Sequence, residues 1–400
     1  MTEKKTVVIA VAAVVILVIA AFLVVFALPG NSDDSDGKYT IKANVTKDCT
    51  GTPFYVGTDI GYFDANNINF VDQGELDYGL VPTALLAGRT NIYDGHPNTI
   101  INLLQSGAKV KGVVMTGYEP DNLSEIEKLH MHWLVDKTRT DGKTITSVAE
   151  LFEKVSKPKI AVLATGVCAD LEVQILLDKY GKSAVKDYDI IQLTDPNQEA
   201  ALQSGQIDVA VLHPPFYSAV EGHNDVNVIA VSTDTLGQYA GVSLLVFTES
   251  FIADHPDTVR QFIIAYKAAQ RWSNDHQVEA GRLTADTIGL DNAVPHWASY
   301  SGKITDADLQ PWIDALVKFG YLEKDQFKPS DLYTTEFSDL WVQPTKAEPL
   351  NPFNSETNAK YKWFDKVGDE ESVLTEVTEL AGITKLVDTA ASPVVVGRDL

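Results

Sequence analysis

The pattern of hydrophobic positions begins with one long apolar run near the amino end. Val7 to Leu28 is 22 residues without a polar side chain, which is long enough to span the hydrocarbon core of a bilayer as a helix. Lys4 and Lys5 precede this run, and an acidic linker at residues 31–37 follows it. The positive-inside rule then predicts a membrane anchor over residues 1–30 that leaves the rest of the chain outside the cytoplasm. A cleaved signal peptide is the alternative.

After the linker, short apolar runs typical of strands alternate with segments whose apolar residues recur at helical spacing. Val110 to Met115 is an example of an expected strand, and Asp257 to Asn274 of an expected helix. This alternation predicts an α/β protein with largely parallel sheets. The pattern weakens beyond Pro344, so residues 346–400 form a C-terminal extension of unknown role, with one expected helix at Ser372 to Ala381.

One stretch of this pattern occurs twice. ALLAGRTNIYDGHP at Ala84 to Pro97 and ALQSGQIDVAVLHP at Ala201 to Pro214 share a register with an offset of 117 residues. Each copy predicts a helix ended by Gly, then a short strand, then a His-Pro loop. Ligands bind at the carboxyl ends of strands in open α/β sheets, so the repeat predicts two similar lobes with His96 and His213 on opposite walls of one cleft. Chance similarity between two ordinary helix–strand units is the alternative.

Composition excludes some functions. The formal net charge of -23 and the absence of a basic patch argue against nucleic acid as a partner. The two cysteines, Cys49 and Cys168, make no disulfide framework, and a bridge between them would lock the cleft. His96 and His213 raise the question of a metal site, but no third ligand at suitable spacing is evident, so we expect no metal and no cofactor.

Four stretches of the chain, taken in order, resemble the nitrate, sulfonate and taurine group of ABC-transporter solute-binding proteins. They are TPFYVGTDIGYFDANNINF, LLAGRTNIYDGHPNTIINLLQSGAKVKGVV, ALQSGQIDVAVLHPPFY and ESFIADHPDTVRQFIIAYKAA, within the region Tyr39 to Glu336. The resemblance implies the type II periplasmic-binding fold, in which two α/β lobes are joined by two crossing hinge strands. Lobe one would comprise residues 38–130 and 236–345, and lobe two residues 131–235.

The resemblance also implies a function. The chain would be a membrane-anchored extracytoplasmic receptor, not an enzyme, that captures a small solute between its lobes and hands it to an ABC permease with its ATPase. A nitrate-like, sulfonate-like or taurine-like anion is the implied solute. No Arg lies in the candidate loops, which leaves a neutral or aromatic ligand open. The alternatives are a pyrimidine or thiamine-precursor binding protein, a synthase-like enzyme of the same superfamily, and a surface sensor without a permease.

The candidate ligand contacts lie at strand ends and helix starts that face the predicted cleft. The loop from Thr165 to Asp170 is the most suggestive, because a Gly-containing loop that opens a helix offers free N–H groups to an anion, although ordinary helix capping explains it nearly as well. The candidates in lobe one are Thr52, Pro53, Phe54, His96, Asn98 and Thr99, and those in lobe two are Thr165, Gly166, Val167, Cys168, His213, Pro214 and Phe216.

Overall fold

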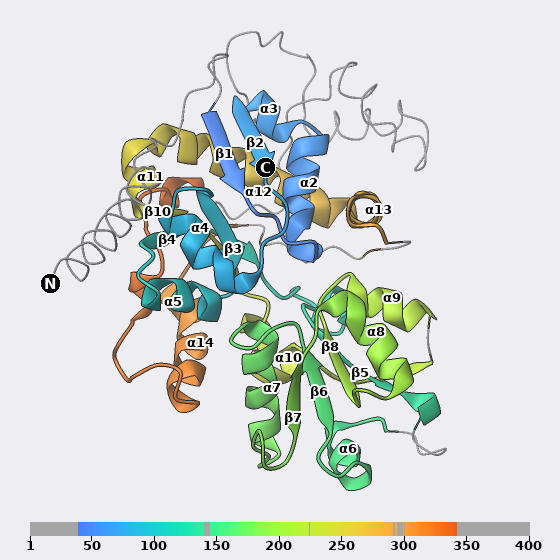
Figure 1. Cartoon of the computed structure of the whole chain (residues 1–400). Helices are drawn as coiled ribbons and strands as arrows, with labels where there is room; N and C mark the ends of the chain where they lie inside the picture. The colour runs from blue at the N-terminus through green and yellow to red at the C-terminus, as the bar shows by residue number, and fades with distance from the viewer. Residues whose placement is uncertain are drawn as a thin grey trace, which may run out of the picture.

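The computed structural model describes residues 39–139, 145–223, 225–290, 293, 299 and 301–341. Two α/β lobes lie one above the other in Figure 1, and the chain passes from the first to the second and back again. The predicted membrane anchor, the acidic linker and the C-terminal extension lie outside the described residues. Within the described part of the chain, no helix has the length and apolar character needed to cross a membrane.

Lobe one contains five strands in two hydrogen-bonded groups. They are β1 (Tyr39–Ala43), β2 (Ile68–Asp72), β3 (Ile92–Gly95), β4 (Val110–Gly117) and β10 (Ser243–Thr248). β1 pairs with β2 in parallel, and the other three strands lie in the order β3-β10-β4. The side chain of Asn91 links the two groups, because its Oδ1 accepts a hydrogen bond from the backbone N–H of Lys42 at 2.9 Å. The strands of this lobe therefore run in the order β2-β1-β3-β10-β4.

Lobe two repeats this arrangement in one continuous sheet. Its strands are β5 (His132–Asp136), β6 (Lys159–Val162), β7 (Asp189–Gln192), β8 (Val209–Leu212) and β9 (Val226–Val231), in the order β7-β6-β8-β5-β9. β8 occupies the place that β3 has in lobe one, and the first residues of these strands, Ile92 and Val209, differ by the 117 residues of the sequence repeat. The helix and strand predicted for both copies of the repeat are confirmed.

The expectation of largely parallel sheets is only partly correct. β1 with β2, and β6 with both β7 and β8, are parallel, but β5 and β10 are antiparallel to each of their neighbours. The reason is that β5 and β10 each follow a crossing of the chain between lobes. They begin at the lobe boundary and run outward, whereas the other strands of the main sheets end there.

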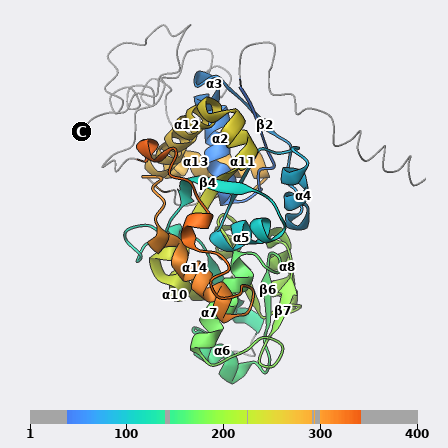
Figure 2. The ribbon, with the colours of Figure 1, turned by 90° about the vertical axis from the view of Figure 1, so that its left-hand side faces the viewer.

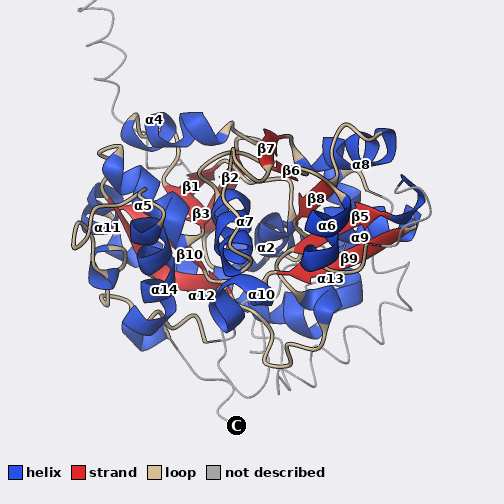
Figure 3. Ribbon diagram, turned by 90° about the horizontal axis from the view of Figure 1, so that it is seen from below, coloured by secondary structure: helices blue, strands red, loops and turns tan. Residues whose placement is uncertain are grey.

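Helices surround both sheets, as Figure 3 shows from below. They are α2 (Thr52–Asp59), α3 (Tyr62–Ala65), α4 (Val81–Leu86), α5 (Pro97–Gln105), α6 (Val148–Lys154), α7 (Cys168–Lys179), α8 (Asp195–Ser204), α9 (Phe216–His223), α10 (Thr233–Leu236), α11 (Glu249–Asp254), α12 (Pro256–Asp275), α13 (Gln277–Ile288) and α14 (Asp306–Lys318). Of these, α9, α10, α11 and α13 were not expected from the sequence. α11 and α13 each adjoin the long helix α12 with a single His between them, so hydrophobic periodicity does not separate the three.

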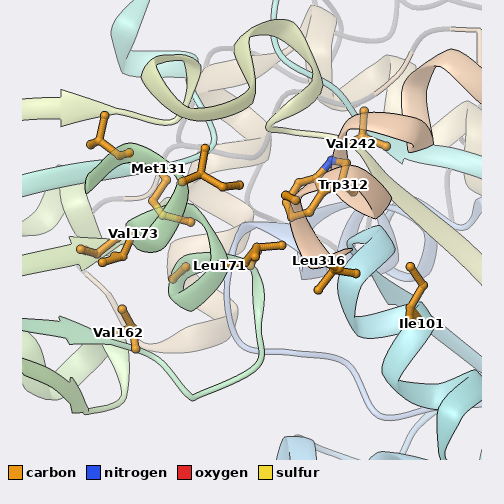
Figure 4. Packing of buried hydrophobic residues seen from close by; sticks show 14 of the residues in the cluster. Ile101, Met131, Val162, Leu171, Val173, Val242, Trp312 and Leu316 are labelled. Atoms are coloured by element: carbon orange, nitrogen blue, oxygen red, sulfur yellow. The ribbon is translucent and has the colours of Figure 1, made fainter. Parts of the chain in front are cut away.

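The largest hydrophobic cluster extends across the boundary between the lobes. Trp312 of α14 and Ile101 of α5 belong to it, as do Leu171 and Val173 of α7 and Met131, which precedes β5. Figure 4 shows these side chains converging from the two sides, and Figure 2 shows α14 beside both α5 and α7. Burying a large apolar side chain contributes roughly 1.5–3 kcal/mol, so this cluster favours closed lobes.

Polar contacts also join the lobes. The side-chain amides of Asn98 and Asn102, both on α5, donate to the backbone carbonyl of Gly166 at 3.0 Å each. Gln174 of α7 makes a further contact of this kind, because its Nε2 donates to the hydroxyl of Tyr321, which follows α14, at 2.7 Å. Gly166 has a φ of +81°, a left-handed conformation that Gly adopts without strain, and this turn presents its carbonyl to α5. The structure is thus a closed state of the two lobes.

Candidate functional site

Three histidines and one cysteine meet at the lobe boundary. The rings of His96 and His130 are 4.4 Å apart, and those of His130 and His213 are 5.3 Å apart, measured between centroids. Cys168 Sγ lies 3.1 Å from His213 Nε2. None of these four side chains is more than 6% exposed. We call His96, His130, Cys168 and His213 the boundary cluster.

The fold places each member of the boundary cluster at the end of an element. His96 follows β3 directly and is the N-cap residue of α5, while His213 follows β8 directly. Cys168 is the first residue of α7. His130 lies in the segment that carries the chain from β4 to β5. The cluster therefore draws one side chain from lobe one, two from lobe two and one from a crossing segment.

Hydrogen bonds fix the orientation of His96. Its Nδ1 lies 2.8 Å from the backbone carbonyl of Val242, and a carbonyl oxygen can only accept, so Nδ1 carries the hydrogen. In the neutral ring Nε2 then keeps its lone pair. Trp312 packs over the same ring with a centroid separation of 5.4 Å and an interplanar angle of 28°.

A second line of hydrogen bonds runs through lobe two from Asp195 to His213 to Cys168. Asp195 Oδ2 lies 2.8 Å from His213 Nδ1, and the other ring nitrogen faces the sulfur. Burial by itself lowers the pKa of His213, but the charges of Cys168 and Asp195 beside it raise it well above its ordinary value. Burial raises the pKa of the Cys168 thiol, and His213 opposes that effect. This arrangement can accept the proton of the thiol and stabilise the thiolate.

Two buried carboxylates surround His130. Glu172 Oε1 lies 3.3 Å from His130 Nε2, and Glu172 Oε2 accepts a hydrogen bond from the Thr235 hydroxyl at 2.9 Å. Glu119 accepts from the backbone N–H of His130 at 3.2 Å and from the Ser232 hydroxyl at 2.5 Å. Burial raises the pKa of Glu172 well above its ordinary value and that of Glu119 to about 7. The two crossing segments are therefore tied together at this point.

Sequence reasoning missed several polar groups that line the cleft. Asp48 is buried in lobe one, which raises its pKa, and it is close enough to His213 and Asp195 for their charges to act on that pKa. Burial likewise raises the pKa values of Tyr78 and Tyr93, and the charge of Cys168 adds to the shift in both. His130, Glu172 and Asp195 were also not expected. The only signal for His130 in the sequence is its place just before the first strand of lobe two.

The structure brings some predicted residues together and separates others. The boundary cluster contains three of them, His96, Cys168 and His213. A hydrogen bond between the lobes joins Asn98 to Gly166. The hydroxyl of Thr99 donates to the carbonyl of His96 at 2.8 Å. Of the remaining candidates, Val167 and Phe216 are buried apolar side chains, Thr165 lies near Gln192 at 3.4 Å, and Pro214 forms a cis bond with Pro215.

The first candidate segment does not reach the boundary cluster. Inside the hydrophobic core of lobe one, Phe54 stacks on Phe70 and packs against the tilted ring of Tyr266, with centroid distances of 5.3 and 4.9 Å. The hydroxyl of Thr52 pairs with that of Thr284 at 2.7 Å, and Pro53 is buried in the first turn of α2. The reason is that α2 packs on α12 and α13. Contact of these three residues with a ligand stays a prediction that this packing does not support.

The boundary cluster can also hold a metal ion. His96, His130 and Cys168 each offer one ligand atom, and these atoms all lie within 4.8 Å of one another. From the sequence, no third ligand was evident beside His96 and His213. The structure groups His96 with Cys168 and with His130 of a crossing segment instead, and His213 contacts the sulfur of Cys168 without belonging to this set.

Solved structures share the architecture described above. The periplasmic nitrate-binding protein NrtA from Synechocystis PCC 6803 matches with a TM-score of 0.60 and 12% identity over 77% of this chain and 91% of its own. The alkanesulfonate-binding protein SsuA from Xanthomonas axonopodis pv. citri, bound to MOPS, matches with a TM-score of 0.58 and 15% identity over 74% and 98%. The desulfurization enzyme DSZB matches with a TM-score of 0.51 and 13% identity over 76% and 96%. These likenesses establish the α/β periplasmic-binding-protein type II fold.

Sequence comparison identifies the family. No curated protein matches the chain significantly. The model of the NMT1-like family matches residues 65–289, which is more than half of the chain and includes every member of the boundary cluster. The protein therefore belongs to the NMT1-like family.

Proposed function

We propose that this protein is an extracytoplasmic solute-binding receptor of an ABC importer. It takes a small solute between its lobes, and the closed form is the state that the permease recognises. The N-terminal apolar segment would span the membrane and hold the rest of the chain outside the cytoplasm, as the charges around that segment predict. The same fold in nitrate-binding and alkanesulfonate-binding proteins supports this proposal.

The observation that carries the proposal is the boundary cluster itself. Its polar side chains come from both lobes and from a crossing segment, and all are buried because the lobes are closed. In the closed state these side chains are paired with neighbouring groups of the boundary, and in the open state they offer donors and acceptors to a solute from both sides. A solute that binds such groups from both sides at once stabilises the closed state, which is how ligand binding becomes a signal.

The charges at the boundary bear on the class of solute. An anion is the class that the similar structures suggest, yet the carboxyl groups of Asp48, Glu172 and Asp195 surround the cluster, and none is more than 7% exposed. A nitrate or sulfonate there would have to displace these groups or meet them protonated. The residues of this chain therefore support a neutral or cationic solute more than an anionic one.

One observation favours a second function, that of a thiol-dependent enzyme. A Cys whose sulfur contacts a His, which in turn contacts an Asp, is the arrangement that activates a nucleophile. A receptor binds its solute unchanged, whereas an enzyme with this site forms a covalent adduct at Cys168 or consumes its substrate. Mass spectrometry of the protein after incubation with each candidate solute distinguishes the two.

The test of the receptor function is a thermal melt of the full chain in detergent with a panel of solutes. Nitrate, taurine, alkanesulfonates, bicarbonate, thiamine precursors and riboflavin represent the candidate classes. A solute at about 100 times its Kd adds about 2.7 kcal/mol to the free energy of unfolding, which is several degrees in Tm for a protein of this size. The bound solute should also protect Cys168 from alkylation. Co-purification of a permease and an ATPase would exclude the permease-free sensor.

A further inference from the structure

We propose that His96, His130 and Cys168 bind a single divalent metal ion of the zinc type, and that this ion further stabilises the closed state of the two lobes. The inference deepens the proposed function, because it names the class of solute that the receptor takes. The site itself depends only on the arrangement of these residues.

The ligand set has the right chemistry. Imidazole nitrogen and thiolate sulfur are the donors that select Zn²⁺ and related borderline or soft ions over Mg²⁺ or Ca²⁺. Zn–N bonds of about 2.0 Å and Zn–S bonds of about 2.3 Å place tetrahedral ligands roughly 3.3–3.8 Å apart. The three ligand atoms here already lie within 4.8 Å of one another, so a small contraction completes the geometry. The fourth position remains for water or for a donor carried by the ion.

Each ligand is oriented by a second group, as metal-binding side chains commonly are. His96 donates from Nδ1 to the Val242 carbonyl at 2.8 Å, which leaves the lone pair on Nε2. Glu172 lies 3.3 Å from a ring nitrogen of His130. His213 contacts the sulfur of Cys168 at 3.1 Å and is itself held by Asp195. His213 can take the proton that the thiol must lose when it binds a metal.

The charges are consistent with a cation. A Zn²⁺ ion with one thiolate and two neutral imidazoles carries a net charge of +1, and His213 adds +1 once it has taken the thiol proton. Glu172 beside His130 and Asp195 beside His213 are each no more than 3% exposed, and their two carboxylates can balance these two positive charges. The same carboxylates would repel an anionic solute at this point. A cation therefore satisfies the cluster where an anion does not.

The location of the ligands makes the site depend on closure. His96 belongs to lobe one, Cys168 to lobe two, and His130 to the segment between β4 and β5. All three can reach one ion only when the lobes are together. An ion that enters the open cleft would bind first to part of this set and then favour closure by its additional bonds in the closed state. Metal binding and the closed conformation are thus coupled through these residues.

The experiment measures Zn²⁺ binding to the metal-free full chain by competition with a chromophoric chelator. We expect one ion per chain. Cys168→Ser, His96→Gln and His130→Gln should each weaken binding by more than about 100-fold, since even partners of metal ligands are worth about 10–100-fold. His255→Gln is the matched control, because His255 packs against Phe251 in lobe one, away from the cluster. Co²⁺ should give a thiolate charge-transfer band that Cys168→Ser lacks. Melts without metal check that each variant is folded.

The native chain gives a readout that needs no variant. Stoichiometric Zn²⁺ should stop alkylation of Cys168. Zn²⁺ binding that none of the three substitutions weakens would identify an adventitious surface ion and overturn the inference. If Zn²⁺ fails to bind but a solute of the panel raises Tm, the metal inference fails and the receptor function stands. If neither Zn²⁺ nor any solute binds, both fail. A covalent adduct at Cys168 would assign the cluster to thiol catalysis instead.

Discussion

The two asparagines of α5 provide a direct test of what holds the lobes closed. Asn98 and Asn102 both donate to the carbonyl of Gly166 on the opposite lobe at 3.0 Å. We expect the double substitution Asn98→Ala, Asn102→Ala to raise the population of the open form. Ala is a better helix former than Asn, so α5 itself should persist and the lost contacts should dominate the effect.

The magnitude follows from the two hydrogen bonds. Each contributes about 0.5–1.5 kcal/mol net, so their joint loss shifts the equilibrium by about 1–3 kcal/mol. At 1.4 kcal/mol per tenfold change, the open population should rise by about 5- to 140-fold. Either single substitution should raise the open population by about 2- to 12-fold. Values near the lower end are expected for the single variants, because each keeps one of the two donors.

Alkylation of Cys168 reports the open population. The thiol is 5% exposed in the closed structure, so a small alkylating reagent reaches it chiefly when the lobes separate. The rate is measured in the metal-free protein by mass spectrometry of the Cys168 peptide. Dividing by the rate in denaturant corrects for differences in the reactivity of the reagent. Neither asparagine contacts the sulfur, so the substitutions leave the thiol's own surroundings intact. The double variant should therefore react about 5- to 140-fold faster than the parent, in proportion to its open population.

Asn227→Ala is the matched control. Asn227 also donates from its side-chain amide to a backbone carbonyl, that of Ile145 at 2.7 Å, but both residues belong to lobe two. It should lower Tm without changing the alkylation rate of Cys168. If the α5 double variant behaves in the same way, with a lower Tm and an unchanged rate, the asparagines stabilise the fold rather than the closed state, and the reasoning is refuted.

Three further substitutions test the buried charges. Asp195→Asn removes the negative charge that supports protonated His213, so the pH midpoint for alkylation of Cys168 should move upward in a rate–pH profile. Burial raises the pKa of Asp94 from 3.8 to about 7, so its contribution to stability is complete below about pH 3.8 and is lost as pH rises through about 7. Asp94→Asn should therefore reduce the dependence of Tm on pH between pH 4 and 7. Burial lowers the pKa of Lys267 from 10.5 to about 6, so its contribution to stability is present at high pH and is lost as pH falls through about 6. Lys267→Met should therefore raise Tm most at pH 5–6. A lower Tm there would contradict this account.

Much of the fold could be predicted because its local signals agree. In the repeat, a Gly that ends a helix and a β-branched run after it specify α4 with β3 and α8 with β8. The direction of β5 and β10 could not be predicted in this way. Hydrophobic periodicity indicates that a segment is a strand, but it carries no information about which neighbours the strand pairs with. Their antiparallel pairing follows from the path of the chain between lobes, which is a property of the whole fold.

The candidate site shows the same division. His96 and His213 could be found from the sequence because each ends a strand in the repeat, and strand ends are where α/β proteins place ligands. Phe54 is a candidate because it lies at a helix start, yet it lies in the core of lobe one, since an aromatic side chain at a helix start packs inward when other helices cover it. His130 has no signal beyond its place before a strand, because it lies in an irregular segment whose position is fixed only when both lobes form.

The position of His130 also explains why the site favours the closed state. A site made only from the two copies of the repeat would join one wall to the other and leave the hinge out. Here the backbone N–H of His130 donates to Glu119, which also accepts from Ser232 on the returning crossing segment. A ligand held by His96, His130 and Cys168 therefore acts on both walls and on the connection between them. Because Glu119 links the two crossing segments without contacting the proposed ion, Glu119→Gln should raise the alkylation rate of Cys168 by a larger factor than it weakens the affinity for Zn²⁺. Changes by the same factor would mean that Glu119 serves only to position His130.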